Sequence, residues 1–286
     1  MTQSSDNLKD LYNDIFKIND YFYEGENGQL MLDDEHGSIE DYCDYGSSSG
    51  NGKCQNDYLK MASSGVIHLL KDLMKYGLEN DKLAEYAILF LSYKLDQKKK
   101  DKLTDLNKFY TDHIETNKYY NEKIKDVDTT TYKDIINKKI NLLNINEISK
   151  FNDPFGILLL LYHVIKNNKL DCTKYSSYPK NFADQFETLN NDSNNIENSS
   201  YNKLLSTLSN DYNNLKNKYD NKNSCSFPSL PKIKPKKNSV EDSGKGDIQI
   251  LGEGSEGTSS PSILKTVIPV LSTFFVISLF LGVAYK

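Results

Sequence analysis

The strongest match to a catalytic motif lies in the short stretch between two cysteines. Gly46 to Gly50 fits the pattern G-x-S-x-G, with Ser48 at the nucleophile position. That motif works at a strained strand-to-helix turn beside an Asp and a His, and no strand is predicted ahead of it. The run from Gly46 to Lys53 is one residue too long for a phosphate-binding loop, and Cys54 replaces the Ser or Thr that would hold magnesium. A serine-rich spacer explains both matches, so we expect neither a hydrolase nor a nucleotide-binding protein.

Metal-ligating residue types are present, but their spacing does not favour a metal site. Four residues could be assembled as zinc ligands: His36, Cys43, Cys54 and His68. Structural zinc sites use short ligand pairs such as C-x-x-C, and the sequence has none. His113 and His163 lie among apolar residues at helical spacing and are expected to be core histidines, while the carboxylates of residues 33–35 belong to a solvated loop. We therefore predict no catalytic residue, no metal site and no cofactor.

The four cysteines can form three different sets of two disulfides if they are oxidised. Cys43 and Cys54 are the pair that we favour, because the Gly- and Ser-rich segment between them is flexible enough to close. Cys172 and Cys225 are left unassigned. Free thiols in a reducing compartment are the alternative.

The composition argues against nucleic acid as a partner. The chain of 286 residues has a formal net charge of -5, and all 35 of its basic residues are lysine. It therefore lacks the guanidinium groups that read guanine and phosphate in a bidentate manner. The first 16 residues have neither a basic nor an apolar region of the kind that forms a cleavable signal peptide, so we expect sorting to use the far end of the chain.

Apolar residues recur at helical spacing almost throughout the chain, and no long stretch alternates as a strand would. We therefore predict an all-α, multi-helix domain over residues 1–225, with the main loops at 24–56 and 190–200. The segments 83–95 and 155–165 are apolar nearly all round, so we expect both to be central buried helices. The second of them is too short to span a bilayer.

The last predicted helix of this domain carries a regular apolar seam. Its members are spaced alternately by four and three residues: Tyr201, Leu205, Leu208, Tyr212, Leu215 and Tyr219. Such a seam packs against one partner helix, either within the domain, which we favour, or in a second copy. The second arrangement would give a weak homo-oligomer.

The end of the sequence predicts a membrane anchor. Residues 266–285 are uncharged, and twenty helical residues span about 30 Å, the thickness of the hydrocarbon core. Residues 226–265 are rich first in Pro and Lys and then in Gly and Ser, which is typical of a disordered linker. The sequence thus predicts a helical domain at 1–225, a linker at 226–265 and a single transmembrane helix at 266–285 in a lipid bilayer.

An ordered set of motifs over most of the chain resembles one protein family. The motifs are CDYG and GKC within 43–54, LAEYAILFLSYKL at 83–95, LTDLNKFY at 103–110, YNEKIKDVD at 120–128, YKDIINKKINLLNI at 132–145, LLSTLSNDYNNLKNKY at 204–219, FPSLP at 227–231 and the terminal VIPVLSTFFVISLFLGVAYK. On these residues the chain resembles the Plasmodium interspersed repeat (PIR) proteins, a family of malaria-parasite variant antigens, and its rodent-parasite members in particular.

The resemblance implies a non-enzymatic helical domain exposed on infected cells or parasite membranes, with antigenic variation and with proposed roles in adhesion and immune evasion. Three features depart from the family pattern. The family's cysteine near the N-terminus is missing, Tyr175 replaces the second cysteine of the pair that begins at Cys172, and a short basic tail after Lys286 is missing. The first two departures mean that the family's disulfide pattern cannot be transferred whole.

The side of the membrane on which the domain lies depends on how lysines are counted. Lysines between 232 and 237 outweigh Lys286, so the positive-inside rule applied to this sequence alone places the domain in the cytoplasm. A basic tail of the kind that the resemblance implies would reverse this orientation. Because four cysteines lie on one side of the predicted helix, and because of the resemblance, we expect the domain outside.

These observations predict a non-enzymatic, membrane-anchored variant surface antigen involved in immune evasion or adhesion. Loops 24–56 and 190–200 would face host surface molecules or antibodies, and the anchor would lie in the parasite or infected host-cell membrane. The alternative is an intracellular tail-anchored scaffold that uses the seam at 201–219 as a coiled coil. The alternative predicts free thiols and an oligomer.

Overall fold

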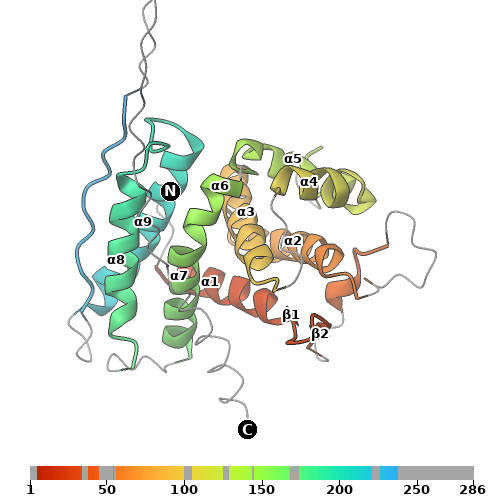
Figure 1. Cartoon of the computed structure of the whole chain (residues 1–286), viewed down its shortest axis with the longest axis horizontal. Coiled ribbons are helices and arrows are strands. Elements are labelled where there is room, and N and C mark those ends of the chain that lie inside the picture. The colour runs from red at the N-terminus through yellow and green to blue at the C-terminus, as the bar shows by residue number, and fades with distance from the viewer. Residues whose placement is uncertain are drawn as a thin grey trace, which may run out of the picture. The chain divides into compact units, whose positions relative to one another are not determined.

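Helices make up most of the chain that the structure describes, and a short β-hairpin follows the first of them (Figure 1). The computed structural model describes residues 5–33, 38–44, 54, 56–99, 105–124, 129–143, 145–167, 174–220 and 226–237. All of these described residues belong to one compact unit, 1–239. The mostly helical character predicted from the apolar periodicity is confirmed.

The secondary structure is best given in chain order. The α-helices are α1 (Ser5–Asp20), α2 (Tyr58–Met74), α3 (Asn80–Asp96), α4 (Leu106–Phe109), α5 (Tyr132–Asn137), α6 (Ile145–Ile148), α7 (Asn152–Lys166), α8 (Ser177–Asn190) and α9 (Ser200–Tyr219). Shorter turns of π- or 3₁₀-helix are η2 (Tyr110–Glu115), η3 (Lys118–Asn121), η4 (Ile140–Leu143) and η5 (Ser149–Phe151). Antiparallel strands β1 (Phe22–Glu24) and β2 (Leu30–Leu32) lie at the start of the predicted loop 24–56.

Helices α3 and α7 form the centre of the domain. Helix α7 packs against α1, α3, α8 and α9, and α3 packs also against α2 and α5. Nearly every residue of α3 from Leu83 to Leu95 is buried, and so is the run from Phe155 to Leu161 in α7. The prediction that these two segments are central is confirmed, because an all-round apolar helix is stable in water only when neighbours cover it.

A buried carboxylate links four of these helices. Tyr12 of α1 and Tyr86 of α3 donate hydrogen bonds to the carboxylate of Asp211 in α9, at 2.7 and 2.9 Å, and Tyr162 of α7 donates to its backbone oxygen at 2.8 Å. Burial raises the pKa of Asp211 to about 6, against the opposing effect of the two phenol donors. Full hydrogen bonding is what makes such a polar group tolerable in the core.

Helix α9 turns its apolar seam inward. Five of the six seam residues are buried, namely Tyr201, Leu205, Leu208, Tyr212 and Leu215. Helices α7 and α8 of the same chain cover them. The seam therefore packs within the domain, and α9 offers no exposed apolar row to a second copy along these residues.

Part of the segment after residue 225 packs against the helices. Residues 226–237, which we call the strap, run back along α8 and α9 in an extended conformation (blue in Figure 1). Phe227 is buried against the ring of Tyr212, and Lys236 forms an isolated parallel bridge with Ile196. The first part of the predicted linker thus belongs to the helical domain.

Within the described part of the chain, none of the helices is both long enough and apolar enough to cross a bilayer. The predicted transmembrane helix at 266–285 and the rest of the predicted linker lie outside the described residues.

Candidate functional site

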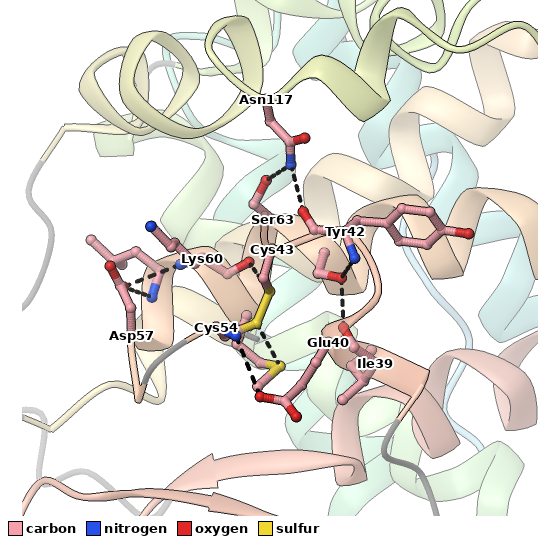
Figure 2. The surroundings of a disulfide bond; sticks show 12 residues. Ile39, Glu40, Tyr42, Cys43, Cys54, Asp57, Lys60, Ser63 and Asn117 are labelled. Atoms are coloured by element: carbon pink, nitrogen blue, oxygen red, sulfur yellow. Dashed lines mark hydrogen bonds between the residues drawn. A yellow bond between two sulfur atoms is a disulfide. The ribbon is translucent and has the colours of Figure 1, made fainter. Parts of the chain in front are cut away.

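The region richest in sequence signals is the loop before α2, and its two ends are placed next to each other. We call residues 38–44 and 54–57 the loop frame, because they enclose residues 45–53. Figure 2 shows the frame lying over the first turns of α2, with Asn117 approaching from the other side. Residues 45–53, including Ser48 and both glycines of the G-x-S-x-G match, lie outside the described residues.

A disulfide between Cys43 and Cys54 joins the two ends of the frame (Figure 2), and the Cα atoms of the two residues are 4.8 Å apart. Both residues are fully buried. The Sγ atom of Cys54 lies 3.5 Å from Sδ of Met61, and that of Cys43 lies 3.5 Å from the carbonyl oxygen of Lys60. The disulfide therefore rests on α2 and forms part of the core.

The C-terminal side of the frame leads directly into α2. Asp57 is the N-cap, and its carboxylate accepts hydrogen bonds from the backbone N–H groups of Leu59 and Lys60 at 2.9 and 3.2 Å. The N–H of Asp57 donates to the carbonyl of Cys54 at 2.9 Å, and the N–H of Cys54 donates to Oε1 of Glu40 at 3.3 Å. The two sides of the frame are thus also joined by a hydrogen bond.

Two consecutive serines of α2 hold the N-terminal side of the frame. The Ser64 hydroxyl donates to the carbonyl of Ile39 at 2.5 Å and accepts from the N–H of Tyr42 at 3.2 Å. Ser63, which is fully buried, donates to the carbonyl of His113 at 2.7 Å. Because both hydroxyl protons point to backbone carbonyls, these serines have a structural role.

Asn117 closes the frame from the opposite side. This side chain is completely buried, and its Nδ2 group donates to the carbonyl of Tyr42 at 3.0 Å and to the hydroxyl of Ser63 at 3.3 Å. Its Oδ1 atom accepts from the N–H of Tyr119 at 3.1 Å and so caps η3. One amide therefore satisfies polar groups from three segments.

An aromatic cluster covers the outer edge of the frame. The ring of Tyr42 lies 4.8 Å from that of His68 and 5.3 Å from that of Tyr119, and the ammonium group of Lys71 lies 4.8 Å from the Tyr42 centroid. Burial lowers the pKa of His68 below its ordinary value of 6.5. The imidazole is therefore neutral at neutral pH and packs as an aromatic ring.

The other residues singled out from the sequence are scattered or not described. Outside the described residues lie His36, Ser48, Cys172 and Cys225. His113 packs against Phe109 with ring centroids 5.0 Å apart, and His163 stacks on Phe16 at 3.7 Å. Among the residues that the structure describes, no group of His, Cys, Asp and Glu side chains could hold a metal ion.

Sequence reasoning missed the polar residues that hold the frame. Ser63 and Ser64 lie between Ala62 and Val66 on a helix that is otherwise apolar on this side, and that interruption was a usable signal. Asn117 gave none, because nothing near it in sequence marks it as buried. The bonds of the frame hold residues 43 and 54, on either side of 45–53, with their Cα atoms 4.8 Å apart.

Comparison with known proteins agrees with this architecture. Residues 4–286 match the family model described as "Plasmodium variant antigen protein Cir/Yir/Bir". A solved structure described as "Structure of a Plasmodium PIR protein ectodomain" has 33% sequence identity and a TM-score of 0.58, and the match covers 81% of this chain and 100% of that one. No curated protein matches the chain. Since the family model covers nearly the whole sequence, the chain belongs to the Plasmodium Cir/Yir/Bir variant antigen family.

Proposed function

We propose that the protein is a membrane-anchored surface antigen whose helical domain faces outward and presents residues 45–53 to host molecules or antibodies. Adhesion or immune evasion would follow from the surface of this segment, without catalysis. The observation that carries the proposal is the loop frame, whose described residues are bonded to each other and to α2.

The described bonds that hold the frame involve residues outside 45–53. They are the buried disulfide, the Asp57 cap and the hydrogen bonds of the Asn117 amide. Residues 46–52 are glycine, serine and asparagine. Loop-closure entropy changes slowly with length, by about 0.6 kcal/mol for each doubling. Sequence and length between 45 and 53 can therefore vary at little cost to stability.

The second loop that we expected to be presented, 190–200, has a different environment. Asn190 and Asn195 are buried and bind the strap or each other, so part of this loop is committed to the fold. Figure 1 places the strap toward one end of the helical unit and the ends of the loop frame toward the other. We therefore centre the proposal on 45–53, because the described ends of its frame lie away from the strap (Figure 1).

The strap also bears on membrane orientation. The positive-inside rule counts lysines within about 15–20 residues of a span. Lys237 lies 29 positions before Thr266, and the strap lysines belong to a folded unit. On the domain side of the predicted span, that window contains Lys265 and none of the strap lysines, so the strap lysines no longer favour a cytoplasmic domain. The alternative scaffold also loses support, because its seam is buried within the chain.

The test is the accessibility of a tagged full-length copy in intact and in lysed infected cells. We expect added protease to digest the domain without lysis. In the denatured protein, which exposes the buried pair, we expect a maleimide to label Cys43 and Cys54 only after a reductant is added. Protection from protease in intact cells, with thiols that react in the denatured protein without a reductant, would reject the outward orientation. A C43S/C54S variant controls for labelling at Cys172 and Cys225.

A further inference from the structure

The strap carries a straight row of positive charge. Lys232, Lys234 and Lys236 are exposed, whereas Ile233 and Pro235 between them are half-buried. In an extended chain, alternate side chains point to the same side, with about 6.6 Å between them. The three ammonium groups therefore form a line along one side of the strap, and the exposed side chain of Lys237 follows on the other side.

Hydrogen bonds to the domain keep this row extended. The Asn190 side chain donates to the carbonyl of Lys232 at 2.8 Å and accepts from the N–H of Lys234 at 2.9 Å, as a neighbouring strand would. The N–H of Lys236 donates to Asn195 at 2.8 Å, and its carbonyl accepts from Glu197 at 2.9 Å. A ligand of the row would not have to order the backbone, which removes a main cost of binding to a flexible basic segment.

The opposite end of the strap is anchored by aromatic packing. Phe227 is buried beside Tyr212, which stacks on Phe182 with ring centroids 4.5 Å apart. The hydroxyl of Tyr212 donates to the carbonyl of Pro228 at 2.9 Å, and the N–H of Phe227 donates to Asp220 at 3.0 Å. The row is thus held at both ends.

The charge of the row is available for an external partner. Across the described residues, no carboxylate lies within ion-pair distance of Lys232, Lys234 or Lys237. Lys236 helps to lower the pKa of Asp192, but among the described residues no ion pair joins these two side chains. Many other described lysines do form ion pairs, as Lys139 does with Glu85 at 3.1 Å. The chain as a whole has a net charge of -5, whereas four lysines without an ion pair among the described residues lie within six positions of the strap. The strap is therefore a local concentration of positive charge.

We propose that the lysine row binds a linear sulfated polysaccharide. Sulfate groups spaced along a chain can meet ammonium groups spaced along the strap, and release of counterions from the polyanion supplies affinity. Single-stranded nucleic acid fits less well, because residues 229–237 have no aromatic side chain on which bases could stack. An anionic bilayer fits less well, because it presents a plane of charge to a row that is one residue wide.

The proposal gives a ligand class to the adhesion role proposed above and rests on that role for its biological setting. Its physical test is independent of orientation, because binding can be measured on the isolated full-length protein. A domain that faced the cytoplasm would still bind the polyanion in such an assay, and an outward domain that did not bind would still pass the protease test.

The probe is heparin, immobilised on a sensor surface, and the protein is the full chain in neutral phosphatidylcholine nanodiscs. The test variant is K232Q/K234Q/K236Q, which removes the row. The matched control K123Q/K138Q/K203Q removes the same charge from other exposed lysines. We expect the test variant to bind at least tenfold more weakly in about 0.1 M salt, with a shallower dependence of log K on log salt concentration. The control should remain within twofold of the wild type.

Three results would overturn the proposal. The first is wild-type binding by the test variant, and the second is an equal loss in the control, which would indicate a net-charge effect. The third result has two parts. The wild type would bind heparin negligibly but would bind phosphatidylserine vesicles, and the test variant would lose the vesicle binding. The row would then be a membrane-docking surface. Circular dichroism of each variant checks that the fold is intact.

Discussion

Two loops that look alike in sequence, residues 38–57 and 190–199, are held by different means. Both are polar and rich in small residues. The first is closed on itself by the Cys43–Cys54 disulfide and rests on α2. The second uses buried asparagine side chains to bind a segment more than 30 positions further along the chain. The comparison shows two ways of holding a loop. The described ends of the first are bonded to each other and to α2, whereas residues inside the second bind another part of the fold.

We expect the largest change in stability from removing the Cys43–Cys54 disulfide. Replacing both cysteines in C43S/C54S should lower the free energy of unfolding by about 3 kcal/mol, because the unfolded chain regains the entropy that the cross-link removes. This corresponds to roughly 10 °C in Tm for a domain of this size. Thermal unfolding of the full chain in nanodiscs, followed by circular dichroism, measures it. The Ser48→Ala variant is the control, and an equal Tm for wild type and C43S/C54S would show that the closure contributes nothing.

Removing one amide side chain from each loop should lower the free energy of unfolding by a smaller amount. Asn117→Ala should cost about 2 kcal/mol, since it leaves the buried carbonyl of Tyr42 without its donor. Asn190→Ala should cost a similar amount through the strap.

Hydrogen exchange distinguishes these two variants. We expect Asn117→Ala to speed exchange in peptides covering 38–44 but not in those covering 230–237, and Asn190→Ala to do the reverse. Faster exchange of both regions in either variant would mean that the loops are coupled, and the comparison between them would fail.

A smaller effect is expected from pH, in different windows for the two loops. Burial lowers the pKa of His68, so the unfolded chain binds more protons just below pH 6.5. The stabilisation of the frame is therefore complete above 6.5 and is lost as the pH falls toward the folded pKa. For Asp192, burial is outweighed by the N–H of Asn194 and by Lys150, which lower the pKa below 3.8. Its contribution is complete above 3.8 and is lost at lower pH.

Local hydrogen exchange between pH 7 and 5 checks this difference after correction for the intrinsic rate. Protection of residues 38–44 should fall with acidification in the wild type and change less in His68→Gln. Protection of residues 190–199 should stay constant over the same range. A parallel loss in both loops, or an unchanged response in His68→Gln, would contradict the assignment of the frame's pH response to His68.

The helical core could be predicted from the sequence because its signal is local. A helix that is apolar on all sides, such as 83–95, must be buried, and this can be predicted without knowing which elements cover it. The seam of α9 is also visible in the sequence, because its apolar residues repeat with helical spacing. The β-hairpin at 22–32 was not predicted, because each of its strands has three residues and the alternation is too short to recognise.

The bonds that hold the two loops could not be predicted because they join distant positions. Asn117 contacts Tyr42 across 75 positions, and Asn190 contacts Lys232 across 42. Asparagine is common on polar surfaces, so a buried copy has no mark of its own in a sequence rich in that residue. The Pro- and Lys-rich strap likewise resembles a linker, because its order comes from the partner groups on α8 and the loop after it.

The most direct test of the central idea is to exchange the contents of the disulfide-closed loop. Residues 46–52 would be replaced by an unrelated polar sequence of equal length, and an equal exchange at 191–197 would serve as the comparison. We predict that the first exchange leaves Tm within about 1 °C while abolishing the binding of antibodies raised against residues 45–53 on intact cells, and that the second lowers Tm by several degrees. A large loss of stability from the first exchange, or unchanged antibody binding, would contradict the account of this loop as a variable segment on a fixed frame.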